Sequence, residues 1–191
     1  MKSDFLKSFR ITLVFCVVFS VFAFVLWAFA HTFSPNKGQV EVVTLNGKVV
    51  GADNVGQAFK KDIYFWGRPS AASYQADASS GSNKGPTNEA YLKDVKARID
   101  TFLLNHPYLT RSEVPAEMVT ASGSGLDPDI TPESAYVQVK RVAKARSLSE
   151  EVVKALVDKQ IEKPLLGLFG PAKVNVLKLN VALEKAANPS R

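Results

Sequence analysis

The strongest hydrophobic pattern in the chain lies near its N-terminus. Residues 11–30 contain no charged side chain, and their only hydroxyl groups belong to Thr12 and Ser20. These twenty residues would extend over roughly 30 Å in a helix, which matches the hydrocarbon core of a bilayer. Trp27, near the end of the segment, suits the interface between lipid and water. We therefore predict a transmembrane helix over residues 11–30.

A cleaved signal peptide is the alternative interpretation of this segment. Ala28-Phe29-Ala30 fits the small-x-small pattern of a cleavage site. However, the apolar part of a signal peptide runs for about 7–15 residues, and this apolar segment is longer. We therefore favour an uncleaved anchor, in which the single cysteine, Cys16, lies in lipid as a small apolar side chain.

The basic residues beside the apolar segment predict its orientation. Lys2, Lys7 and Arg10 precede it, whereas the first basic residue after it is Lys37. Because basic residues stay on the cytoplasmic side, residues 1–10 are expected in the cytoplasm. Residues 31–191 are then expected to form an extracytoplasmic domain.

Two apolar patterns after the anchor predict β-strands. Residues 39–44 and 48–51 flank Leu45-Asn46-Gly47, and Asn-Gly is the strongest short signal for a hairpin. The apolar and aromatic run of residues 63–66 ends before a glycine and a proline, so it predicts another short strand.

Helical spacing of apolar residues begins further along the chain. Leu92, Val95, Ile99 and Phe102 fall on one helical stripe, which Asn105-His106-Pro107 ends. Thr131 is expected to cap a second helix, with Pro132 at its first position. The buried side of this second helix is expected to contain Ala135, Val139 and Val142. Ser149 is expected to cap a third helix, whose inward residues are Val153, Leu156 and Val157.

The final apolar stretch leaves two interpretations open. Residues 177–184 alternate between apolar and other side chains, which is typical of a strand. A helix capped by Asn175 fits the same residues almost as well. With either outcome the fold class is α+β: one N-terminal transmembrane helix and a single mixed α/β domain.

Composition and charge exclude several classes of function. The net charge of +6 is too small, and the basic residues are too evenly spread, to indicate a nucleic-acid-binding protein. One cysteine and two histidines exclude a disulfide framework and predict no metal site. The sequence contains no Walker A motif and no nucleophile elbow, so no catalytic residues are predicted. The basic residues of the second helix are interpreted as a solvated surface: Lys140, Arg141, Lys144 and Arg146.

Two loops rich in small polar residues stand out as candidate sites. They are residues 79–88 and residues 120–128, and each leads toward the start of a helix. Such loops can surround an anion or press closely against a partner's backbone, although turns and helix caps use the same residues. Ser82 and Lys84 in the first loop leave a membrane-anchored serine/lysine hydrolase as an alternative function.

At these loops the chain resembles a known family, the C subunit of the Kdp potassium-transporting ATPase. The resemblance rests on Tyr64-Phe65-Trp66-Gly67-Arg68-Pro69-Ser70-Ala71, Ser80-Gly81-Ser82-Asn83, Gly85-Pro86-Thr87-Asn88, Val119-Thr120-Ala121-Ser122-Gly123-Ser124-Gly125-Leu126-Asp127-Pro128, Gln138-Val139, Arg141-Val142-Ala143, Ala145-Arg146 and Val174-Asn175-Val176-Leu177. The similarity departs at Asp129, where the family usually has histidine, and at Asn54-Val55-Gly56, where it usually has Leu-Ile-Gly.

The resemblance implies an accessory, non-catalytic subunit of the bacterial inner membrane. It implies three partners: a KdpA-like potassium channel subunit, a KdpB-like P-type ATPase subunit and a KdpF-like small subunit. It also implies a catalytic chaperone that raises the ATP affinity of the ATPase subunit, so that ATP is reached through the complex. The nucleotide-binding candidates are then Ser122, Gly123, Ser124 and Gly125.

The predicted orientation conflicts with direct ATP binding, because ATP and the nucleotide site of the ATPase subunit are cytoplasmic. We therefore expect the polar loops to contact the channel-like subunit near the entrance of its ion pathway. The candidate contact residues are Arg68, Ser80, Gly81, Ser82, Asn83, Gly85, Thr87, Asn88 and Asp127.

Overall fold

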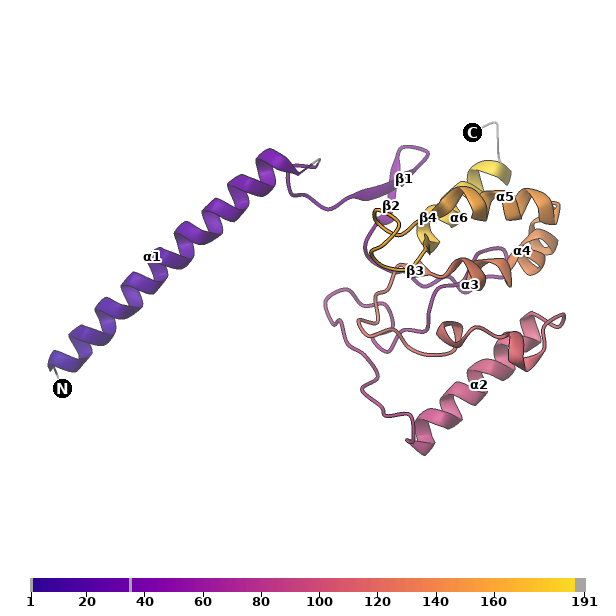
Figure 1. Ribbon diagram of the computed structural model, residues 1–191, viewed down its shortest axis with the longest axis horizontal. Helices are drawn as coiled ribbons and strands as arrows, with labels where there is room; N and C mark the ends of the chain where they lie inside the picture. Colours follow the sequence, from indigo (N-terminus) through magenta and orange to yellow (C-terminus); the bar gives the residue numbers. More distant parts are fainter. Residues whose placement is uncertain (1, 35, 188–191) are drawn as a thin grey trace. The chain divides into compact units, whose positions relative to one another are not determined.

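A computed structural model describes residues 2–34 and 36–187 and divides the chain into two compact units, Met1–Glu41 and Val42–Arg191. The first unit is dominated by one helix, α1 (Lys2–Phe33), drawn in indigo and violet in Figure 1. Residues Asp4–Phe33 are long and apolar enough to cross a membrane, and none of this apolar surface is buried within the structure. The helix begins before the apolar segment because residues 2–10 contain no glycine or proline that would end it.

The second unit begins with the hairpin that the sequence predicted. Strand β1 (Val42–Leu45) pairs with β2 (Lys48–Ala52), and the turn residues Asn46 and Gly47 have φ angles of 52° and 75°. Both angles lie in the left-handed region that a type I′ turn requires, which is why the Asn-Gly pair was informative.

A second sheet has three very short strands in the order β3-β5-β4, all antiparallel. These strands are β3 (Asp129–Ile130), β4 (Ile161–Glu162) and β5 (Lys173–Asn175). The sequence did not reveal them, because two or three residues are too few to show an alternating pattern.

The predicted helices are present, with two changes. Helix α2 (Glu89–Asn105) is capped by Asn88, and α5 (Glu150–Gln160) is capped by Ser149. The second predicted helix is two helices, α3 (Pro132–Tyr136), capped by Thr131, and α4 (Val139–Arg146). The last stretch is a helix, α6 (Val176–Ala187), so the strand interpretation of residues 177–184 was wrong. At the start of α6, the side chain of Asn175 accepts a hydrogen bond from the Lys178 amide.

The helices α3, α4, α5 and α6 lie together, and α2 lies at the opposite side of the domain (Figure 1). Two single-turn 3₁₀ helices, Arg111–Glu113 and Ala116–Met118, follow α2. Buried residues from several elements meet in one core: Phe65, Phe102, Ile130, Val142, Val153, Val174, Leu179 and Leu183. The α+β fold class is confirmed, and the predicted strand at residues 63–66 is wrong, because that segment pairs with side chains rather than with a strand.

Candidate functional site

The two polar loops singled out in the sequence pack against each other. The Ser79 hydroxyl donates a hydrogen bond of 2.9 Å to the carbonyl oxygen of Ser124. The Ser70 hydroxyl donates one of 2.6 Å to the carbonyl oxygen of Gly125. The Ser122 amide donates to the Pro69 carbonyl oxygen at 3.1 Å, and Ser122 is buried. Residues 69–81 and 122–125 therefore form one surface, which we call the paired loops.

Glycine is required where the paired loops touch. Gly125 has a φ of +69°, and a Cβ atom there would lie 2.7 Å from the carbonyl oxygen of Ser80. A Cβ at Gly81 would lie 2.8 Å from the carbonyl oxygen of Gly123. Gly123 itself has open space around it, because no atom of the described residues lies within 4 Å of the position that a Cβ would take. Two of the three glycines thus allow the loops to approach, and the third faces outward.

An ion pair joins two residues that flank the paired loops, Arg68 and Asp127. Arg68 Nη1 lies 3.0 Å from Asp127 Oδ2, and about a quarter of each side chain is exposed. The other carboxylate oxygen of Asp127 accepts a hydrogen bond from the Asp129 amide. The Arg68 carbonyl oxygen accepts one from the Tyr74 hydroxyl. Burial and the nearby Asp127 carboxylate raise the pKa of Tyr74, so this phenol stays protonated and able to donate.

The remaining predicted contact residues lie further along the first loop, toward the start of α2. Asn88 accepts a hydrogen bond from the Tyr91 amide as the helix cap, and the Asn83 backbone has a φ of 51°. Gly85 and Thr87 are exposed, and Ser82 is half-buried. Lys84 pairs with Asp94 at 3.4 Å rather than with Ser82, and no hydrogen bond within the described residues joins Ser82 to Lys84. This arrangement does not support the hydrolase alternative.

The sequence missed a set of buried polar side chains that hold the extended segment 62–66. The Asn180 amide group bonds both the N–H and the carbonyl of Phe65, at 2.8 and 3.0 Å. Gln138 does the same for Trp66, at 2.8 and 3.2 Å. A side chain from the N-cap of α4 and one from α6 thus take the place of a neighbouring strand.

Two arginines complete this set, which we call the segment clamp: Gln138, Arg141, Arg146 and Asn180. Arg141 donates to the carbonyl oxygens of Asp62 and Tyr64, at 2.6 and 3.0 Å, and Arg146 donates to that of Ile63 at 2.8 Å. Arg141 is buried, and the Arg146 side chain is only 9% exposed. The interpretation of α4 as a uniformly solvated basic face was therefore wrong for these two residues.

The acceptors that bind the charged guanidinium of Arg141 are all uncharged groups. Two further Arg141 N–H groups donate to His106 Nε2 at 2.9 Å and to Gln138 Oε1 at 2.7 Å. Burial, opposed by a weaker bond to the Phe102 carbonyl, lowers the pKa of His106 to about 4, so its ring is neutral near pH 7. Burial also lowers the pKa of Arg141 to about 10, which leaves the guanidinium charged.

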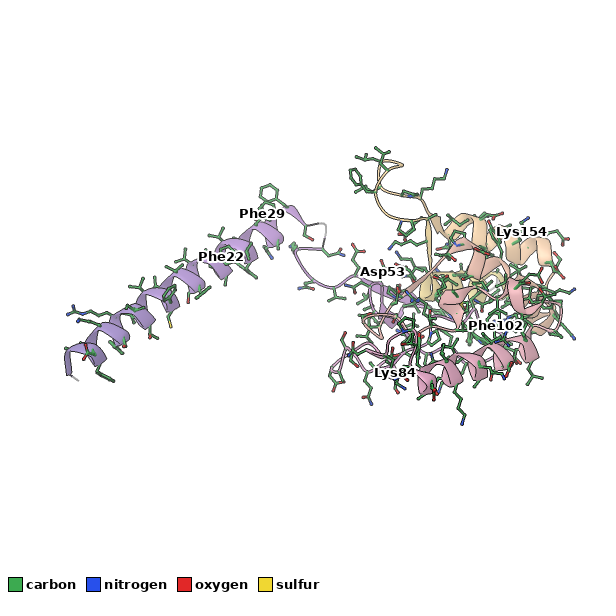
Figure 2. All side chains as sticks on the ribbon, turned by 60° about the horizontal axis from the view of Figure 1, so that its bottom comes forward. Phe22, Phe29, Asp53, Lys84, Phe102 and Lys154 are labelled. Carbon is green, nitrogen blue, oxygen red and sulfur yellow. The ribbon has the colours of Figure 1, made fainter. Side chains whose placement is uncertain are left out.

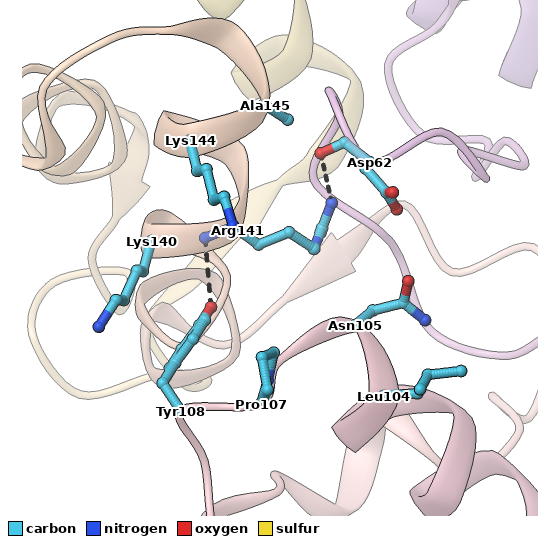
Figure 3. A pocket seen from close by; sticks show the side chains of 9 residues that line it. All are labelled: Asp62, Leu104, Asn105, Pro107, Tyr108, Lys140, Arg141, Lys144 and Ala145. Atoms are coloured by element: carbon cyan, nitrogen blue, oxygen red, sulfur yellow. Dashed lines mark hydrogen bonds between the residues drawn. The ribbon is translucent and has the colours of Figure 1, made fainter.

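A cavity of about 670 Å³ opens beside this arginine (Figure 3). Asp62, Tyr108, Lys140 and Lys144 are among its lining residues, and the Arg141 amide bonds the Tyr108 hydroxyl at 3.3 Å. Four of the five Arg141 N–H donors already bond groups within the domain, so this arginine holds the surrounding structure together rather than serving as a free anion receptor.

Asp129, where the resembling family usually has histidine, belongs to a network of ion pairs. Lys173 lies 2.7 Å from Asp129 and 3.5 Å from Glu162, and the bond to Asp129 raises the pKa of Lys173. Lys178 lies 2.7 Å from Asp53 and 3.6 Å from Glu162. The network ties the chain after β2 to β3, β4 and α6. Among the described residues no cluster of histidine, cysteine or acidic side chains could hold a metal ion.

Comparison with known proteins gives consistent matches. The family model described as "KdpC: K+-transporting ATPase, c chain" matches residues 5–185. The potassium-transporting ATPase KdpC subunit of Phocaeicola vulgatus is 72% identical over 186 residues, which is 96% of this chain and 98% of that protein. The same subunit of Bacteroides thetaiotaomicron is 69% identical over 188 residues, covering 97% and 99% of the two chains. That of Caldanaerobacter subterraneus is 46% identical over 184 residues, covering 96% and 95%.

Proposed function

Because the chain belongs to the KdpC family of K+-transporting ATPase subunits, we propose that it is a non-catalytic subunit that docks on its partners through the paired loops. The accessory place in the complex comes from the family.

The contacts of the paired loops support docking rather than nucleotide binding. The Ser122 N–H, which an anion would need, is bonded to the Pro69 carbonyl oxygen, and the carbonyl oxygens of Ser124 and Gly125 accept from the Ser79 and Ser70 hydroxyls. The Ser124 hydroxyl accepts from the Leu126 amide. Hydrogen bonds between the paired loops fix their backbone, and their side chains are mostly small. Such a surface allows the backbone of another protein to approach closely.

The proposed orientation is an N-terminal cytoplasmic end, a transmembrane helix formed by the apolar part of α1, and a domain outside the cell membrane. The basic residues before the span support it. With this orientation the paired loops can meet the extracytoplasmic face of a KdpA-like channel subunit, where potassium enters. The KdpB-like and KdpF-like subunits then contact the chain within the membrane.

The test of docking is purification of the tagged full chain from potassium-starved cells in a gentle detergent, with mass spectrometry and an ATPase assay. We expect the wild-type chain to recover the channel-like and ATPase subunits. Asp127→Asn, which removes the charge that Arg68 faces, should reduce this recovery several-fold. The matched control is Lys84→Gln, which breaks the exposed pair with Asp94 and also removes the lysine of the hydrolase alternative.

Recovery of the chain alone would contradict the subunit assignment. Normal recovery with Asp127→Asn would contradict docking through the paired loops. If Gly123→Ala left recovery unchanged but weakened the ATP affinity of the complex, the catalytic-chaperone function would be favoured instead.

The orientation is tested separately with a membrane-impermeant maleimide on intact spheroplasts. In a Cys16→Ala background, Lys84→Cys should be labelled from outside without permeabilisation. Labelling that appears only after the membrane is permeabilised would place the domain in the cytoplasm.

A further inference from the structure

The connection between β4 and β5 carries the most exposed apolar surface of the domain. Residues 164–171 read Pro-Leu-Leu-Gly-Leu-Phe-Gly-Pro, without a single polar side chain. Leu165, Leu166, Leu168 and Phe169 are between 63% and 81% exposed. We call residues 164–171 the apolar loop; it projects from the body of the domain (Figure 2).

Most backbone amides of the apolar loop are paired within the loop itself. The amides of Leu165 and Phe169 bond each other's carbonyl oxygens at 3.0 Å, so the loop closes as a small hairpin. The Gly167 and Leu168 amides also donate to carbonyl oxygens inside the loop, at 2.9 and 3.1 Å. A segment with its amides paired internally enters an apolar phase at much lower cost than an open one.

The apolar loop emerges beside the place where the chain enters the domain from the anchor. Strand β5 begins at Lys173, two residues after the loop ends, and Asn175 at the far end of the strand donates a hydrogen bond of 2.7 Å to the carbonyl oxygen of Asp53, which follows β2. Lys178 pairs with the carboxylate of the same Asp53. The adjoining hairpin adds two exposed valines, Val42 and Val49. Apolar side chains therefore gather at the end of the domain that receives the tether.

That tether is short. Residues 34–41 separate the end of α1 from the start of β1, and eight extended residues reach at most roughly 27 Å. An anchored domain therefore stays within that distance of the bilayer surface at this end. Lys163, which is exposed immediately before the apolar loop, adds a positive charge of the kind that anionic lipids attract.

We propose that the apolar loop inserts into the bilayer as a second lipid contact of the domain, in the leaflet that the domain faces. This inference rests on the proposed anchoring by α1. A lipid partner is favoured over a protein because specific protein interfaces combine apolar contacts with about one hydrogen bond per 100–200 Å². The apolar loop offers no polar side chain, and its own hydrogen bonds consume most of its amides.

The experiment places an environment-sensitive fluorophore at one cysteine of the full chain, reconstituted alone into phosphatidylcholine and phosphatidylglycerol vesicles. The loop probe is Leu168→Cys in a Cys16→Ala background. The matched control is Leu104→Cys in the same background, because Leu104 and Leu168 are equally exposed, at 81%. A third probe uses the native Cys16 and reports on α1. Quenching by lipids brominated near the glycerol end of the acyl chain is compared with quenching by aqueous iodide.

We expect the loop probe to be quenched several-fold more by brominated lipid than the Leu104 control, with a blue-shifted emission, and to be shielded from iodide. Equal quenching of the two probes by iodide, with the Cys16 probe in lipid, would overturn the inference while leaving the anchor intact. Failure of brominated lipid to quench the Cys16 probe would instead contradict anchoring, and the inference with it.

Assembly with the other subunits provides the remaining comparison. Persistent lipid quenching of the loop probe in the purified complex supports the inference. If the probe is exposed to iodide in vesicles and becomes shielded from both quenchers only in the complex, the apolar loop binds a protein partner and the lipid inference is wrong.

Discussion

Arg141 Nε donates a hydrogen bond of 2.9 Å to Nε2 of His106, inside the domain. The other ring nitrogen of His106 lies 2.8 Å from the Phe102 carbonyl oxygen, so Nδ1 carries the proton and Nε2 is free to accept. A protonated ring has no lone pair for Arg141 and would put a second positive charge beside it. The segment clamp therefore depends on a neutral His106.

The first prediction is a loss of stability in mild acid. The unfolded chain binds a proton at His106 near pH 6.5, whereas the folded chain does so only near pH 4. The contribution of the neutral ring is therefore complete above pH 6.5 and declines as the pH falls toward 4. The two pKa values differ by roughly 2.5, which corresponds to about 3 kcal/mol at the acidic limit.

Urea unfolding of the full chain in detergent measures this effect, with Trp66 fluorescence as the signal in a Trp27→Phe background. Trp66 is a suitable reporter because its ring lies 4.1 Å from the Arg141 guanidinium. In His106→Gln, whose amide oxygen can accept from Arg141, the dependence between pH 6.5 and 4 should become much weaker. An unchanged slope in that variant would assign the acid sensitivity to other groups.

The second prediction concerns the loss of Arg141 itself. Arg141→Met leaves the carbonyl oxygens of Asp62 and Tyr64 without their donor inside the domain. We expect a loss of about 3 kcal/mol or more in the free energy of unfolding, because each buried unpaired group costs about 1–3 kcal/mol. Lys140→Met, the exposed neighbour on α4, should change stability by less than about 0.5 kcal/mol. Similar effects of the two variants would contradict a central role for Arg141.

The third prediction separates two glycines of one loop. Gly125→Ala places a Cβ 2.7 Å from the Ser80 carbonyl oxygen at a left-handed backbone angle, and should destabilise the domain by about 1–3 kcal/mol. Gly123→Ala meets open space and should be nearly neutral. Limited proteolysis of the paired loops should accelerate only in Gly125→Ala. Equal cleavage of both variants would show that the loops do not depend on this contact.

The fourth prediction tests whether the Asn180 side chain is needed to pair the backbone of Phe65 in the extended segment 62–66. Asn180→Leu keeps a similar volume but leaves the N–H and the carbonyl of Phe65 unpaired in the core. We expect a loss of about 2–5 kcal/mol in urea unfolding. Asn105→Leu is the control, because Asn105 is only half-buried and its side chain donates to the Thr101 carbonyl oxygen within α2. A small loss in Asn180→Leu would mean that water or a rearranged backbone replaces the amide.

Local signals explain which elements the sequence predicted well. The hairpin depended on Asn46 and Gly47, whose left-handed angles are favoured by those residues themselves. The prediction of α2 depended on its apolar stripe from Leu92 to Phe102, and those of α3 and α5 on the caps Thr131 and Ser149, which bond amides only three residues away. Turns and helix caps depend only on residues that are close together in the sequence, so they can be recognised without knowledge of distant contacts.

The polar core was not predictable in the same way. A glutamine, two arginines and an asparagine on amphipathic helices read as surface residues, because burial is not visible in a local pattern. Their partners lie far away in the sequence: Asn180 and Phe65 are separated by 115 positions, and Arg146 and Ile63 by 83. Residues 63–66 were predicted as a strand for a related reason, since an apolar run fits any extended, buried backbone.

The sequence by itself determined the apolar N-terminal segment, the helix caps, the turn chemistry and the two glycine-rich loops, because each depends on residue type at short range. Only the tertiary structure decided that the two loops pack together, that Arg141 is buried against a neutral histidine, and that side chains replace a strand beside Phe65. These outcomes depend on contacts between segments that only the packed core brings within hydrogen-bonding distance.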